Sequence, residues 1–123
     1  MDKFSQILAA AGRKNLKNCV EKGSFMVKHI IIWKLREEIE DKESVKVIIK
    51  AGLEGLPGKI PGLLEMHIKT EGFDSSSGDI MMDSSFESVE ALKDYQKNPL
   101  HLNVAEGAVR PNVSKRLSFD YEL

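Results

Sequence analysis

The run from Val27 to Leu35, VKHIIIWKL, constrains the fold more than any other stretch of the chain. Side chains alternate between the two faces of an extended strand, so odd-numbered and even-numbered residues here point in opposite directions. Apolar side chains occupy the middle of both faces, which is typical of a strand that is covered on both sides. One layer of helices can cover only one face. We therefore expect a second cover on the other.

The rest of the chain changes between strand-type and helix-type patterns. Apolar residues recur at helical spacing after a capping Asp41 or Ser44, which predicts a helix; they are Val45, Ile48, Ile49, Leu53 and Leu56. Alternation predicts further strands over residues 63–71, 79–86 and 115–123. The order strand, helix, strand, strand, helix, strand predicts an α+β domain of ferredoxin-like βαββαβ type. Such a domain has an antiparallel four-stranded sheet with its helices on one face.

The start of each later helix is marked by a capping residue. Ser88 is expected to cap a helix over residues 88–98, because a serine hydroxyl can accept from the free N–H groups of a first turn. Asn98 is expected to cap the next helical stretch, with Pro99 at its first position. Pro111 is expected to end that stretch.

A sheet with helices on one face leaves its other face bare. Ile31, Trp33 and Phe119, or their neighbours, would then form an apolar patch larger than a monomer normally exposes. A second copy packed face to face is the simplest cover, so we predict a homodimer whose two sheets enclose a cavity. We expect His29 to point into that cavity, and Ile31, Trp33 and Phe119 to line a pocket for a small hydrophobic ligand.

Composition excludes several other classes of protein. The net charge is −1 and the pI about 6.3, which does not indicate a nucleic-acid-binding surface. Cys19 is the single cysteine, so an intramolecular disulfide and a thiolate metal cluster are excluded, in keeping with a cytoplasmic location. No apolar run approaches the roughly 18 residues of a membrane-spanning helix. Three histidines without a matching carboxylate cluster do not indicate a metal site.

The first 25 residues differ from the rest and are predicted to be an extension outside the domain at 26–123. They carry a surplus of lysine and arginine, and the spacing of Phe4, Ile7, Leu8 and Ala11 allows a short helix. Its apolar face is small for a helix lying on a membrane surface. One hypothesis is that translation starts naturally at Met26, because EKGS can be encoded by a purine-rich run resembling a bacterial ribosome-binding site. The N-terminal mass of the native protein would test this.

Three stretches resemble a known family: MVKHIIIWKL, LPGKIPG, and FESVEALKDYQKNPLHLNVAEGAV followed by FDYE. In this order and spacing they resemble the stress-responsive A/B barrel domain (Dabb) family of dimeric α+β barrels, over residues 26–123. The resemblance implies two ferredoxin-like units paired into a barrel, with helices outside and a pocket in each half. Some plant members of this family are linked to heat or salt stress, one branch cyclises polyketides, and many bacterial members have no assigned activity.

The resemblance to the cyclase branch rests on three residues. That branch has a histidine after Val-Lys in the first strand and a tyrosine shortly before Pro-x-His, which correspond to His29, Tyr95 and His101. Asn98 departs from the pattern, since the cyclases have a histidine there. The resemblance implies His101 as a base, His29 as its oriented partner and Tyr95 as a donor to a carbonyl oxygen, in an aldol-type reaction without cofactor.

Each of these residues also has a purely structural interpretation. His29 can be a hydrogen-bonded core residue, His101 can brace the helix after Pro99, and Tyr95 can pack its ring. The functions left open are a homodimeric Dabb protein with a small-ligand pocket, a cofactor-free polyketide-cyclase-like lyase, and an oligomeric scaffold without a pocket. The residues alone do not decide whether the protein is an enzyme.

Overall fold

The computed structural model describes residues 25–123, so the first 24 residues of the predicted extension lie outside the described part of the chain. The elements follow the predicted order: β1 (Val27–Leu35), α2 (Lys42–Glu54), β2 (Leu63–Lys69), β3 (Ile80–Phe86), α3 (Val89–Lys97), α4 (Pro99–Val104) and β4 (Val113–Glu122). A π-helical turn (Ala105–Val109) and a 3-10 turn (Arg110–Asn112) connect α4 to β4. Within residues 25–123 no helix has the length and apolar character needed to cross a membrane.

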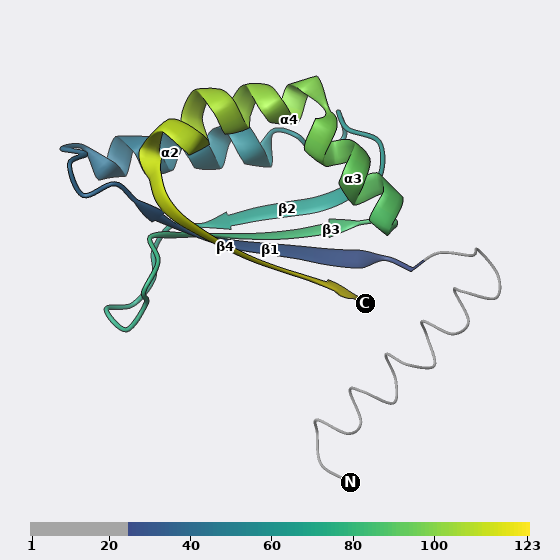
Figure 1. The fold of residues 1–123 in the computed structure, drawn as a ribbon, viewed down its shortest axis with the longest axis horizontal. Coiled ribbons are helices and arrows are strands. Elements are labelled where there is room, and N and C mark those ends of the chain that lie inside the picture. Colours follow the sequence, from purple (N-terminus) through teal and green to yellow (C-terminus); the bar gives the residue numbers. More distant parts are fainter. Residues whose placement is uncertain (1–24) are drawn as a thin grey trace, which may run out of the picture.

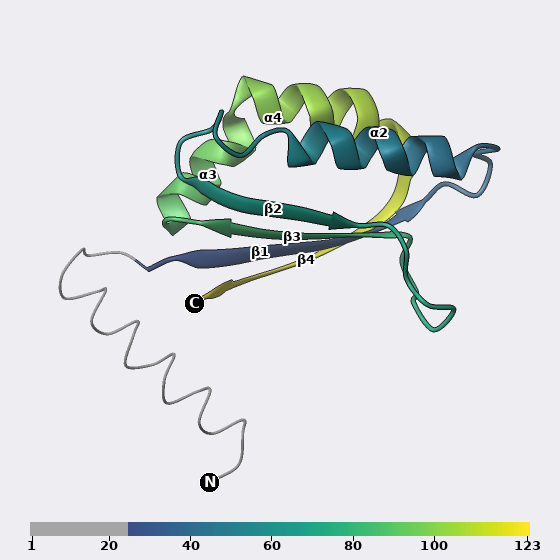
Figure 2. The ribbon, with the colours of Figure 1, turned by 180° about the vertical axis from the view of Figure 1, so that it is seen from behind.

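The strands form one antiparallel sheet in the order β2-β3-β1-β4. All three helices lie on one side of this sheet, and the β2–β3 loop hangs on the other side (Figure 1). The view from behind agrees: no described helix covers the second face (Figure 2). The predicted ferredoxin-like α+β architecture is confirmed, with β1 in an inner position and β4 at an edge.

The predicted helix caps are confirmed as well. Asp41 accepts a hydrogen bond from the Ser44 N–H, and Ser88 accepts one from the Ala91 N–H. Asn98 accepts from the Leu100 N–H at 2.9 Å and starts α4 ahead of Pro99. These side chains pair N–H groups that a helix cannot satisfy in its own first turn.

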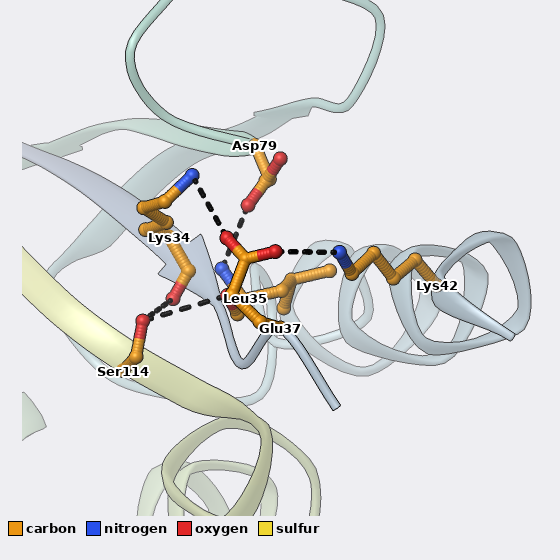
Figure 3. Close-up of polar contacts among 6 residues, drawn as sticks. All are labelled: Lys34, Leu35, Glu37, Lys42, Asp79 and Ser114. Atoms are coloured by element: carbon orange, nitrogen blue, oxygen red, sulfur yellow. Dashed lines mark hydrogen bonds and ion pairs between the residues drawn. The ribbon is translucent and has the colours of Figure 1, made fainter. Parts of the chain in front are cut away.

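A bulge near the end of β1 sets how β4 pairs with it. The register shifts between Lys34 and Leu35, and the Ser114 hydroxyl lies within donating reach of both carbonyls, at 3.2 and 3.4 Å. On the other side of β1 the Leu35 N–H donates to the Asp79 carboxylate at 2.8 Å (Figure 3). Both flanks of the strand end are therefore held, and the register of β4 is defined from this point onward.

The two faces of β1 differ in burial, and this shows that the predicted patch of Ile31, Trp33 and Phe119 on the bare face is wrong. Its odd-numbered side chains are all buried on the helix side, so Ile31 and Trp33 do not belong to the bare face. Phe119 lies opposite Ile30 in the ladder and is 69% exposed on the bare face. Alternation had separated the two sets of residues without indicating which set the helices cover.

One residue of the predicted helical stripe is also misplaced. Ile49 and Leu53 are buried under α2, whereas Ile48 is 58% exposed. Consecutive helical residues are separated by about 100° around the axis, and only one narrow stripe of α2 contacts the sheet. Ile48 lies beside that stripe.

A glycine in the PGKIPG turn explains how this loop packs. Gly62 has a φ of +83°, and a Cβ there would come within 2.5 Å of the Ala91 Cβ on α3. Only glycine combines a positive φ with such a close approach. The turn can thus lead directly into β2 while lying against α3.

Two neighbouring substitutions on α2 test this packing. Ile49→Ala should lower the free energy of unfolding by about 2–5 kcal/mol, because it removes a fully buried side chain. Ile48→Ala, at the exposed neighbouring position, should change it by less than about 0.5 kcal/mol. Urea unfolding at one fixed protein concentration would measure both, and equal losses would contradict the described burial.

Candidate functional site

A cavity of about 510 Å³ lies between the helix face of the sheet and the segment that runs from α4 to the start of β4. His29, Tyr95 and His101 all line it, together with Ile31 and Trp33. Its volume lies within the range of about 300–1,000 Å³ typical of small-molecule sites. Phe119 is not among the lining residues of this cavity, which lies within one chain. The cavity expected between the sheets of two subunits stays a prediction.

The π-helical turn shapes one wall of this cavity. Between α4 and β4 the Arg110 N–H donates to the Ala105 carbonyl, five residues back, instead of four as in an α-helix. Ala105 and Val109 are buried in this turn and line the cavity. Such turns occur frequently at functional sites. Sequence patterns did not predict this one.

His29 is held by a carboxylate that the sequence analysis missed. It is 2% exposed, and its Nδ1 contacts the Asp120 carboxylate on the neighbouring strand β4. The two residues lie opposite one another in the β1–β4 ladder. The carboxylate places a proton on Nδ1, so Nε2 is the nitrogen left for a ligand. Alternation in β4 put Asp120 on one face with Arg116, but it did not identify His29 as its neighbour.

Aromatic packing links the other two candidates. The rings of Tyr95 and His101 lie 4.1 Å apart between centroids, tilted by 36°. Phe86 lies 4.9 Å from Tyr95 and 6.2 Å from His29, so it stands between them. Within residues 25–123 no hydrogen bond joins any two of the three candidates. They therefore surround one space and do not form a preassembled relay.

The protonation of His101 and Tyr95 suits them to bind a polar group. Burial lowers the pKa of His101; a hydrogen bond that its ring donates to the Gln96 backbone opposes this, and the charges of Arg110 and Arg116 lower it further. Its Nδ1 is buried and has no partner in the described part of the chain, so this nitrogen is free to form a hydrogen bond with a ligand. Burial raises the pKa of Tyr95 above its usual value, which keeps its hydroxyl protonated as a donor.

These groups can bind a compound that both accepts and donates hydrogen bonds. The Tyr95 hydroxyl can donate to a carbonyl oxygen, and the His101 Nδ1 can accept a hydrogen bond or a proton. The described residues contain no group of three His, Cys, Asp or Glu side chains that could hold a metal ion.

The model of the stress-responsive A/B barrel domain matches residues 27–123, nearly the whole of the described chain. The protein belongs to this family. A search of curated proteins finds no match. The family resemblance of the sequence motifs is thus confirmed over the predicted domain.

Solved structures share the fold. A dimeric protein of unknown function from Bacteroides fragilis is 28% identical with a TM-score of 0.74, covering 80% of this chain and 96% of that one. A Dabb family protein from Mesorhizobium loti is 19% identical with a TM-score of 0.63, covering 80% and 97%. A dimeric ferredoxin-like protein from Thermobifida fusca is 17% identical with a TM-score of 0.67, covering 81% and 92%. The last two likenesses concern the fold alone.

The lowered pKa of His101 makes stability depend on pH. Below the ordinary histidine pKa of about 6.5, His101 binds a proton in the unfolded chain but stays neutral in the folded protein until the pH is lower. The free energy of unfolding should therefore fall as pH is lowered from about 7 to about 5, and His101→Gln should make that slope shallower. Urea unfolding at a series of pH values between about 5 and about 7 measures this slope for the wild type and the variant. An unchanged slope, or an NMR titration of His101 at its ordinary pKa, would contradict the burial argument.

Proposed function

We propose that this protein forms a homodimer in which each subunit binds a small molecule in the cavity beside His29, Tyr95 and His101. The observation that carries the proposal is the meeting of these three polar residues on one cavity of about 510 Å³. They come from separate elements, β1, α3 and α4, so local structure alone does not bring them together. A packed core would have left no such space.

The lining favours a ligand with an apolar body and an oxygen function. Ile31, Trp33, Leu53 and Met82 form an apolar wall, and polar and charged side chains make up about half of the lining. Small-molecule sites typically combine such a wall with a few polar groups that orient the ligand. The unpaired Nδ1 of His101 supports this proposal, because a buried polar atom without a partner costs free energy unless a ligand or water pairs with it.

The bare face of the sheet supports the homodimer. Large apolar side chains lie exposed on β1 and β4, at 41% for Ile32, 72% for Leu117, 69% for Phe119 and 44% for Tyr121. A contiguous patch of this kind is typical of a protein–protein interface. The relatives from B. fragilis and T. fusca are described as dimeric, which adds support. A face-to-face pair would cover the patch and leave the helix-side cavities in separate subunits.

The cyclase-like alternative is not proposed. The relative that shares 28% identity is itself of unknown function, so the comparisons give no reason to favour it. The catalytic residues implied by the resemblance, His29, Tyr95 and His101, are instead proposed as ligand contacts, a role that needs only the hydrogen-bonding capacities described above.

A charge on the bare face should separate the subunits. Phe119→Asp should convert the dimer to a monomer in light scattering coupled to size-exclusion chromatography, because the carboxylate would lose its water in the interface. Val47→Asp is the matched control: Val47 is 66% exposed on α2, on the helix side of the sheet, and the dimer should persist. A wild-type monomer, or a Phe119→Asp dimer, would refute the proposed interface.

The single tryptophan reports on the cavity directly. Trp33 is the chain's only tryptophan and lines the cavity, so its indole N–H gives one NMR signal at the site. The neutral aromatic ketone 3-benzoylpropanamide should shift this signal, and Ala105→Phe, which fills the cavity, should weaken binding about tenfold or more. Gln96→Phe fills the exposed rim without a buried substitution and should act in the same direction. Ala51→Phe, exposed on α2, should have no effect.

An absence of any shift of the Trp33 signal would argue against a ligand pocket. Equal binding by Ala105→Phe, Gln96→Phe and the Ala51→Phe control would place the ligand elsewhere on the protein.

A further inference from the structure

Every charged residue that lines the cavity is a cation. The charged lining residues are Arg110, Lys115 and Arg116, and no aspartate or glutamate is among them. This is unexpected for a pocket predicted to hold a small hydrophobic ligand. All three residues are exposed to solvent, so they stand at the rim of the cavity, where their positive charges attract an anionic group.

Arg116 is the best placed of the three. It lies opposite Trp33 in the β1–β4 ladder, so its side chain leaves the sheet on the helix side, beside the cavity. Lys115 lies opposite Lys34 and projects to the bare face. Arg116 makes no ion pair with any residue from 25 to 123. Its charge is therefore available to a ligand.

Two acidic groups beside the arginines are already engaged. Asp120 shares a face of β4 with Arg116 but contacts His29. Glu106 pairs with Arg110 at 3.4 Å, with both side chains 63% exposed. An ion pair as exposed as this contributes little to stability. Arg110 can therefore exchange Glu106 for a ligand at small cost.

The arginine charges act electrostatically on Tyr95 and His101 in the cavity. Arg116 acts to lower the pKa of the Tyr95 hydroxyl against the effect of burial, and both arginines lower the pKa of His101. These effects require the arginine charges to lie within electrostatic range of the cavity interior. An anion bound near them would be stabilised by the same field.

We propose that the ligand of this pocket is an organic carboxylate with an apolar, carbonyl-bearing body, held at its carboxylate by Arg116 with Arg110. Arginine suits this role, because its planar guanidinium donates two parallel hydrogen bonds to one carboxylate. The body would lie against Trp33 and Ile31, with its carbonyl near Tyr95 and His101. This inference rests on the proposed binding function and names the class of compound that the site selects.

A pair of isosteric probes tests the inference on the full-length protein. 3-Benzoylpropionate carries a carboxylate where 3-benzoylpropanamide carries a neutral amide, and both are titrated against the Trp33 indole signal. The carboxylate should bind about tenfold more tightly than the amide, and Arg116→Gln should remove that preference with less than about a twofold effect on the amide. Lys93→Gln removes the same charge from an exposed position on α3 and should leave the preference intact.

The salt dependence of probe binding provides an independent test of the inference. Raising NaCl from about 0.05 M to about 0.5 M should weaken carboxylate binding and spare the amide, because screening acts on the charged pair. Equal affinity for the two probes overturns the inference and leaves the binding pocket standing, whereas failure of both probes to bind refutes the pocket itself. A preference that survives in both Arg116→Gln and Arg110→Gln, or disappears in Lys93→Gln, also overturns the inference.

Discussion

The antiparallel pairing of β1 with β4 is the constraint on which the rest of the site depends. It joins the first and last elements of the described chain, and its register is set by the bulge at Lys34 and Leu35, where Ser114 meets both carbonyls. From that point, every second pair places a β4 side chain on the helix side of the sheet. His29 thereby meets Asp120, and Trp33 meets Arg116. A slip of one residue would move both β4 side chains to the opposite face.

The same pairing gives the sheet two different faces, one that lines the cavity and one that is exposed. On the helix side, β1 contributes the buried wall of a cavity that α4 and its π-helical turn complete. On the other side, alternate residues of β1 and β4 form an exposed apolar face that suits a second subunit. The inner strand β1 thus contributes side chains to both surfaces, which explains why its residues are apolar on both faces. Substitutions at neighbouring positions of β1 should consequently affect different properties of the protein.

The elements themselves could be predicted from local patterns, and the positions of side chains between elements could not. The caps at Asp41, Ser88 and Asn98 were predictable because capping depends on the residues within one turn of the chain. The contact of His29 with Asp120 was not, because it joins residues 91 positions apart. The location of Phe119 away from the cavity was missed for a related reason. Alternation separates two faces of a strand, but only the packed helices decide which face is inside.

The amino-acid sequence by itself determined the order of the elements, the starts of the helices, the ferredoxin-like class and the family. These depend on periodicity, capping and turn residues, which act over a few neighbouring positions. Tertiary structure decided the rest: which face of the sheet the helices cover, that His29, Tyr95 and His101 line one cavity, and that arginines rather than acids border it. Such features depend on the register of distant strands and on the packing of helices across them. Their physical cause is long-range contact, which no local pattern in the chain encodes.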